Sequence, residues 1–488
     1  MSPAPQMATL SALDYIYRLS PRNWRGIANC RQERNKRMHK PLAISLLCAG
    51  LSLHTLSAQA ESLIEVYEMA LKQDPQLRSA EAERQASAEI IPQRKADLLP
   101  NINGTAGIGN ADYDRAGDFD FKNYELSLTQ PLFNRSSWYA LKQGKIEDQA
   151  AAIKLEIARQ DLISRVITAY IEVLRSKSQL SATEAEEAAI KRRLEQAQAQ
   201  YDVGLVAVTD VEEAKASYQR AQVARIQAAN AVDTSLEALE RLTNTVVTQV
   251  NDLKKSYSIT DTDYLSLDDG VDKSIRNNLN IAYADTNYRA AKMGVTISES
   301  GHYPTVGLNL SHGYTKNEST IDGDYNKISL SVSVPLYSGG AVSSKVRQAY
   351  ATANQYEADY DDALREIRQQ TRTLLRNLQT NVATVTAQDL TIKASDTALK
   401  ATEAGYEVGT RNVVDVLDAE QNLYQSIRDY ANARYDYVAN QVKLKQLQGA
   451  LSVSDIRELD GWLTPLSEQG VEKKSTGKNG TDKKSKKQ

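Results

Sequence analysis

The chain has 488 residues, of which 41% are hydrophobic and 25% charged, and its formal net charge is −3 at pH 7. Only three Phe and three Trp are present, which argues against several globular cores and favours a long helical assembly. The net charge is too small to single out a class of partner.

The N-terminal segment has the three parts of a secretory signal. Basic residues at 31–37 precede an apolar run from Leu42 to Leu56, and Ala58-Gln-Ala60 follows. This order predicts cleavage after Ala60, so that residues 1–60 are a signal with an N-terminal extension. The 37 residues ahead of Met38 match no part of a signal; an upstream start that is not used is one explanation, and a long n-region is another.

Both cysteines, Cys30 and Cys48, fall within this segment, so the mature chain is expected to contain neither disulfides nor thiols. Lipid attachment at Cys48 is disfavoured because Leu47 occupies the position where a small residue is expected.

Residues 61–97 have helical spacing and are expected to end before Pro100. An extended segment from Asn101 to Tyr113 and an alternating one from Tyr124 to Pro131 then predict a β-hairpin. In the second half of the chain, apolar positions alternate with serines along a similar strand: Ile328, Leu330, Val332 and Val334 against Ser329, Ser331 and Ser333.

Strands with one apolar and one small polar face occur in membrane barrels with a wet lumen. Aromatic residues gather near the strand ends, as in interfacial girdles: Tyr113, Phe119, Phe121, Tyr124, Phe133, Trp138, Tyr303, Tyr314, Tyr325 and Tyr337. The chain supplies only four such strands, whereas closed membrane barrels need about eight or more. The barrel is therefore expected to be shared between copies.

A long helical segment follows each hairpin, from Trp138 to Val203 and from Ala341 to Val408. At about 1.5 Å per residue each would be roughly 100 Å long. Heptad-like spacing predicts coiled-coil seams at Ile163, Val166, Tyr170 and Val173, and at Leu364, Ile367, Thr371, Leu374, Leu378, Val382 and Val385.

Charged residues such as Arg159, Asp161, Arg165, Glu366, Arg368 and Arg372 lie between the seam positions, which excludes membrane-spanning helices. Returning helices are expected from Asp210 to about Leu242 and from Asp415 to about Leu451. The polar segment from Thr243 to Asp272 joins the two halves as a candidate belt around the helix middle.

The chain repeats itself at a fixed interval. The segment Tyr201-Asp-Val-Gly-Leu-Val-Ala-Val-Thr-Asp-Val211 returns as Tyr406-Glu-Val-Gly-Thr-Arg-Asn-Val-Val-Asp-Val416, identical at six of eleven positions. Pro100 and Pro131 are 31 positions apart, as are Pro304 and Pro335. We therefore predict two structural repeats, 61–272 and 273–466, each with helix, β-hairpin and long helical hairpin.

This paired motif resembles the TolC-type outer-membrane efflux channels, as do Gln130-Pro-Leu-Phe133, Pro335-Leu-Tyr-Ser-Gly-Gly340 and Ala433-Arg-Tyr-Asp-Tyr437. The resemblance covers nearly all of Glu61 to Trp462. It implies an α+β membrane protein: a homotrimer with a shared twelve-stranded barrel in outer-membrane lipid and a helical tunnel through the periplasm.

The resemblance also implies partners and an activity. Such channels dock onto a periplasmic adaptor (membrane fusion) protein and an inner-membrane transporter of a tripartite efflux or type I secretion system. They export drugs, toxins or polypeptides without a cofactor, through an iris-like periplasmic gate.

Asp415 and Asp418 are three residues apart and so share one helix face. In a trimer they would form two rings of carboxylates that favour cations, and in the resemblance they match the periplasmic entrance. The plainer interpretation is that Asp415, like Asp210, caps a helix; the two roles can coexist.

By the same resemblance, Tyr406 and Arg411 tether the inner hairpin to the outer one, with Asp210 as carboxylate partner, and form a gate latch. Gly204 and Gly409 permit tight turns. The tip presented to the adaptor would consist of these glycines with Val203, Leu205, Val206, Val408 and Thr410.

Other interpretations are weaker. His302 and His312 flank a strand without metal-ligand spacing, and Gly104, Gly107 and Gly109 precede no helix, so neither an enzyme, a metal site nor a phosphate loop is indicated. The Lys-rich tail 467–488 is interpreted as disordered rather than as a nucleic-acid contact. The main alternative is a periplasmic coiled-coil adaptor or scaffold protein of an export complex, and another is an outer-membrane protein that binds or hydrolyses a ligand.

Overall fold

A computed structural model describes residues 61–113, 117–254, 256–257, 259, 266–317 and 321–464. The predicted signal with its cleavage site and the Lys-rich tail lie outside these residues. All described residues belong to one unit, Ser57–Gln488. Among them, no helix combines the length and the apolar character needed to cross a membrane.

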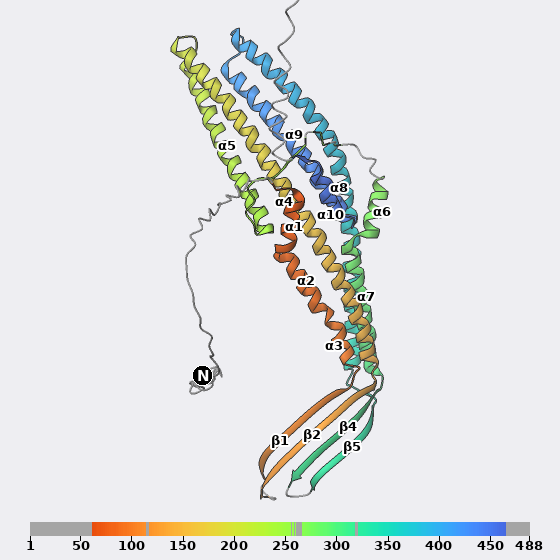
Figure 1. The fold of residues 1–488 in the computed structure, drawn as a ribbon. Coiled ribbons are helices and arrows are strands. Elements are labelled where there is room, and N and C mark those ends of the chain that lie inside the picture. The colour runs from red at the N-terminus through yellow and green to blue at the C-terminus, as the bar shows by residue number, and fades with distance from the viewer. Residues whose placement is uncertain are drawn as a thin grey trace, which may run out of the picture. The chain divides into compact units, whose positions relative to one another are not determined.

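Four antiparallel strands form one sheet at the end of the long helices (Figure 1). Two hairpins build it, β1 (Asn101–Tyr113) with β2 (Gly117–Phe133) and β4 (Thr305–Asn317) with β5 (Ile321–Ser333). The spatial order is β1-β2-β4-β5, so the two hairpins join through β2 and β4. Strands β1 and β5 are left as the outer edges, each with a row of backbone groups that no strand among the described residues pairs.

The register of the strands separates the sheet into two chemically different faces. Ile102, Leu128, Leu310 and Ile328 stand opposite one another across all four strands and form an apolar row. The next row on the other face is Asn101, Thr129, Asn309 and Ser329. Ile102 and Ile328 are 64% and 76% exposed, so the rest of the described chain leaves the edges of the apolar face uncovered. The predicted alternation is confirmed.

Two helical hairpins continue from the sheet. The first consists of α4 (Arg135–Asp202) and α5 (Val208–Thr243), and the second of α8 (Ala341–Glu407) and α9 (Val413–Leu447). The two long helices have 68 and 67 residues and are therefore about 100 Å long. These bounds agree with the predicted ones to within a few residues. Helix α7 (Leu279–Glu299) packs against both α4 and α8.

The same order of elements thus occurs twice: helix, β-hairpin, long helix, returning helix. Predicted seam residues Ile163, Val166, Tyr170 and Val173 are all buried. In α8 the predicted seam residues Ile367, Thr371, Leu378 and Val385 are buried, whereas Leu364, Leu374 and Val382 are half-buried. Leu375, which was not predicted, is buried where it packs over Gly270 of α6 (Leu267–Asn277).

The segment before the first strand forms three helices instead of the single one expected from its spacing. They are α1 (Leu63–Gln73), α2 (Pro75–Ala88) and α3 (Ile90–Ala96). Asp74 interrupts the first two because its side chain accepts the Leu77 N–H at 2.9 Å, and Pro75 then starts α2. Burial alone would raise the pKa of Asp74, but bonds from Arg165 and from Leu77 lower it.

The main core lies around the middle of α4. There α1, α4 and α9 pack with the short elements β3 (Asp252–Leu253), α10 (Val453–Asp460) and β6 (Leu463–Thr464). The Tyr170 side chain is almost wholly buried, and its hydroxyl donates to the carbonyls of Glu61 and Asn251, each at 3.2 Å. The first described residue and the segment that joins the two halves are therefore both fastened to α4 at this level.

Candidate functional site

The two helical hairpins turn at the end of α4 and α8 that is remote from the sheet (Figure 1). Gly204 and Gly409 have φ of +78° and +77°, a left-handed conformation that glycine adopts without a steric penalty. The N–H groups of Gly204 and Gly409 donate to the carbonyls of Tyr201 and Tyr406 at 2.9 and 3.0 Å. The predicted turns are confirmed.

Apolar side chains at these turns project into solvent. Val203, Leu205 and Val408 are 71%, 75% and 75% exposed, whereas Val206 is half-buried and Thr410 is exposed. Exposed valine and leucine at a turn are available for contact with another protein. A role of these residues in docking remains a prediction.

Asp415 and Asp418 lie in the first turns of α9. Asn412 caps this helix, because its side chain accepts the Asp415 N–H at 2.8 Å and the Asp415 carboxylate accepts the Asn412 N–H at 3.2 Å. Asp415 therefore takes part in capping, at the third helical position rather than as the cap itself. The Asp418 carboxylate makes no hydrogen bond or ion pair with any residue in the described ranges.

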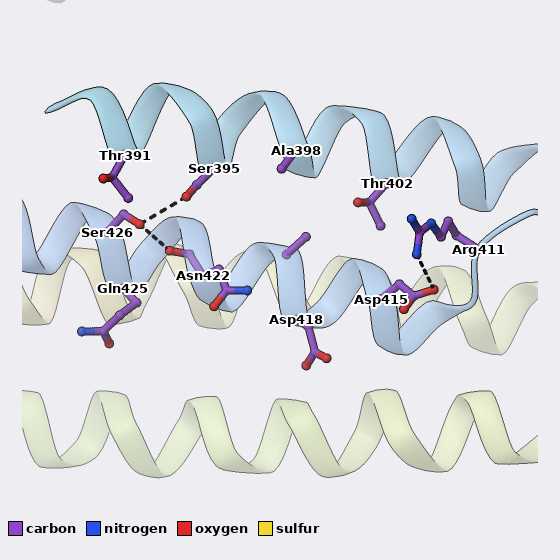
Figure 2. Close-up of a pocket in the computed structure, with 11 residues that line it drawn as sticks. Thr391, Ser395, Ala398, Thr402, Arg411, Asp415, Asp418, Asn422, Gln425 and Ser426 are labelled. Atoms are coloured by element: carbon purple, nitrogen blue, oxygen red, sulfur yellow. Dashed lines mark hydrogen bonds and ion pairs between the residues drawn. The ribbon is translucent and has the colours of Figure 1, made fainter. Parts of the chain in front are cut away.

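A polar groove of about 510 Å³ runs between α8 and α9 beside these carboxylates (Figure 2). Ser426 Oγ bridges it, lying 3.3 Å from Ser395 Oγ on α8 and donating to the Asn422 carbonyl at 2.8 Å. The residues that line the groove are small or polar: Thr391, Ser395, Ala398, Thr402, Arg411, Asp415, Asp418, Ala419, Asn422, Gln425 and Ser426. Such a surface suits water and hydrated cations.

Two of the three predicted latch residues, Tyr406 and Arg411, have different partners within the described chain. The Tyr406 hydroxyl donates to Gln200 Oε1 of α4 at 2.7 Å and so joins the second helical hairpin to the first. Burial raises the pKa of Tyr406, the charge of Asp210 raises it further, and the charge of Arg193 lowers it in part. Arg411 Nη1 lies 3.9 Å from Asp415 Oδ2 and is not joined to Asp210 in this protomer.

A charged contact that sequence analysis missed lies deeper between the hairpins. Arg193 Nε on α4 donates to Glu420 Oε1 on α9 at 2.9 Å, and its guanidinium also pairs with Glu403 on α8. The Glu420 side chain is only 5% exposed. One arginine of the first hairpin thus binds both helices of the second.

Further polar contacts join α4 to α9 toward the main core. Arg428 Nη1 lies 2.5 Å from Glu186 Oε2, with both side chains 10% exposed. Closer to the core, Arg175 Nη2 donates to Asp436 Oδ1 at 2.7 Å. With Arg193–Glu420, and with Tyr406–Gln200, which joins α4 to α8, these pairs form a series along α4 that we term the inter-hairpin ladder. Residues more than 200 positions apart form it, so no local spacing could have indicated it.

Among the residues that the structure describes, no group of three His, Cys, Asp or Glu is placed to hold a metal ion. His312 Nδ1 instead lies 2.9 Å from Asn326 Oδ1 across the β4–β5 pair. The groove supplies a polar lining beside the turn, and the inter-hairpin ladder supplies contacts between helices that can separate.

Known proteins are similar to this chain in sequence and in fold. The family described as "Outer membrane efflux protein" matches residues 66–245 and 270–450. Outer membrane protein TolC of Vibrio cholerae is 34% identical over 432 residues, which are 86% of this chain and 98% of that protein. The proteases secretion protein PrtF of Dickeya chrysanthemi is 29% identical over 438 residues, 86% of this chain and 94% of that one.

The crystal structure of the outer membrane protein VceC from Vibrio cholerae superimposes with a TM-score of 0.70 at 20% identity, covering 79% of this chain and 96% of that one. This likeness supports the fold alone. The family match favours a channel over a periplasmic adaptor or an enzyme. The chain therefore belongs to the outer membrane efflux protein family: it is an outer-membrane channel of the TolC type that extends into the periplasm, and not an enzyme.

Proposed function

We propose that three copies of this chain close their sheets into one twelve-stranded barrel, through which substrates leave the cell passively. The observation that carries this proposal is the four-stranded sheet with β1 and β5 as unpaired edges. Unpaired backbone groups are not tolerated in lipid, so each β5 must pair with β1 of the next copy. The apolar row would then face lipid and the Asn, Thr and Ser row the lumen.

The long helices would continue the barrel as a periplasmic tunnel. In each protomer α4, α7 and α8 follow one another in the same order as β2, β4 and β5, so closing the sheet also closes the helical wall. We infer that a periplasmic adaptor docks at the exposed tips around Leu205 and Val408, and that an inner-membrane transporter supplies the energy. Efflux and protease secretion, which the names of the family and of PrtF describe, suggest small toxic molecules or polypeptides as cargo.

The gate would be the second helical hairpin. Its movement away from α4 requires the inter-hairpin ladder to break, and charge-assisted hydrogen bonds can be exchanged for water or for a partner's groups. Asp415 and Asp418 of three copies would ring the entrance and favour cations. Within one protomer Arg411 makes only a weak pair with Asp415. In the closed ring it is free to reach Asp210 of a neighbouring copy.

Reconstitution of the purified protein in planar lipid bilayers tests this function. A trimeric protein that opens cation-selective single channels, and that restores dye and bile-salt resistance to a strain lacking its own channel, is expected. A protein that alkali extracts from membranes, or that forms no channel, contradicts the proposal.

A further inference from the structure

Glu420 is the most deeply buried carboxylate of the inter-hairpin ladder. Its Oε1 accepts from Arg193 Nε, but its Oε2 is buried and has no hydrogen-bond partner among the described residues. An ionised carboxylate that is removed from water with one oxygen unsatisfied is costly, and protonation relieves that cost because burial penalises only the charged form. The site therefore accommodates the neutral acid better than the anion.

The charges around Glu420 reinforce this preference. Arg193 is shared with a second carboxylate, Glu403 of α8, so it does not neutralise Glu420 alone. Glu186 of α4 adds a further negative charge nearby and is itself paired with Arg428 of α9. Arg192 of α4 offsets part of this, and the half-buried Tyr424 of α9 adds a neutral side chain near the group.

Burial is the main cause that raises the pKa of Glu420 above its usual range, and Glu186 adds to it, while Arg193 and Arg192 lower it only in part. When the second helical hairpin leaves α4, water reaches the carboxylate and its pKa returns toward the ordinary value for glutamate of about 4.3. The joined hairpins consequently bind the proton more tightly than the separated ones.

We propose that Glu420 is a proton-binding site that couples periplasmic pH to the gate, with the proton held while the hairpins are joined and released when they separate. The proposal rests on the proposed gate. The direction of the pH effect follows from linkage. The preference for the joined state is complete below the ordinary pKa of glutamate and is lost as pH rises through the raised pKa of Glu420. Acid therefore holds the gate closed. Each unit of difference between the two pKa values changes the ratio of joined to separated hairpins about tenfold in each protomer.

The test is a spin-label distance measurement between the tips of the two helical hairpins, with labels at L205C and T410C of the detergent-solubilised trimer. Both native cysteines lie at or before residue 48. In the trimer with the unmodified inter-hairpin ladder, the distance between the two labels is expected to be short at pH 4. By pH 8 it is expected to become a mixture of the short distance and a longer one. Glu420→Gln, which imitates the neutral acid, is expected to remain at the short distance throughout.

Two matched variants separate Glu420 from its neighbours. Glu403→Gln removes the other carboxylate on Arg193 and is expected to retain the pH response. Glu186→Gln removes a negative charge near Glu420, and the midpoint is expected to move to lower pH. A Glu420→Gln trimer that responds to pH like the unmodified one overturns the proposal, as does an unmodified trimer whose tip distance is constant. Should Glu420→Gln fail to assemble, an unmoved midpoint in Glu186→Gln overturns it instead.

The proposed channel function is tested separately by conductance at pH 7. A channel that conducts while its tip distances ignore pH would remove only the inference about Glu420, whereas the absence of channels would remove the proposed function.

Discussion

Replacement of Arg428 by alanine is expected to shift the gate toward its open state. The substitution removes the 2.5 Å contact with Glu186 and the Nη2 bond to Gln425 at 2.8 Å. It leaves the Glu186 carboxylate, which is 10% exposed, without its cation in the joined state. Removing one partner of a buried ion pair costs about 3–5 kcal/mol, and we reduce this to about 2–3 kcal/mol because a little water reaches both groups.

A change of that size lowers the ratio of joined to separated hairpins about 30- to 150-fold. Single-channel recordings in planar bilayers at neutral pH should show a higher mean conductance or more frequent open events. Arg225→Ala is the matched control, because its 2.7 Å pair with Glu187 joins α5 to α4 within one hairpin and is partly exposed. Breaking an exposed pair costs less than about 1 kcal/mol, so its gating should resemble the unmodified protein.

The double variant Glu186→Ala with Arg428→Ala removes both charges and should recover part of the closed state. Equal gating of Arg428→Ala and the unmodified channel would refute the reasoning. So would an equal effect of Arg225→Ala, because the ladder would then have no special role.

Three further predictions concern the barrel, the entrance and the turn. Ile328→Lys, on the apolar row, should cost about 2–4 kcal/mol at the bilayer midplane and reduce trimer in outer-membrane fractions, whereas Ser329→Lys on the other face should be tolerated. Replacing Asp415 and Asp418 by asparagine should lower the K⁺ over Cl⁻ permeability ratio; an unchanged reversal potential in a salt gradient would show that they do not line the entrance. Gly409→Val should cost about 1–2 kcal/mol because φ is +77° there, seen as faster proteolysis at the tip; equal cleavage rates would contradict this.

The sequence alone was sufficient for the elements whose pattern is long and regular. The bounds of α4 and α8 follow from uninterrupted helical spacing between a hairpin and a glycine turn, and β5 from its strict alternation of serine with apolar residues. The division at Asp74 had a local signal, a capping Asp74 followed by Pro75, which the helical spacing of residues 61–97 obscured, and only the bond from Arg165, 91 residues away, lies beyond the local sequence. Leu375 is buried instead of Leu374 because Gly270, on a separate helix, leaves room for it.

The candidate site was predictable where a motif repeats and not where partners meet across the fold. The two turns and the position of Asp415 came from the paired motif, and its capping bond is as local as expected. The partners of Arg193 lie 210 and 227 positions further along the chain, and their meeting depends on how two helical hairpins pack. Tyr406 was expected to engage Asp210, yet it donates to Gln200, one turn before the glycine of the first hairpin.

The central claim, that three copies close one barrel through their free sheet edges, can be tested by engineered disulfides between β1 and β5. Asn103→Cys on β1 would be combined in the same chain with Ser329→Cys, Ser331→Cys or Ser333→Cys on β5, so that neighbouring registers are all sampled. After oxidation in intact outer membranes, the samples are run on denaturing gels under non-reducing conditions. At least one cysteine pair should give disulfide-linked dimers and trimers but no larger species. Single-cysteine variants should remain monomeric. Monomers alone with every cysteine pair, or disulfide-linked species larger than the trimer, would contradict the account.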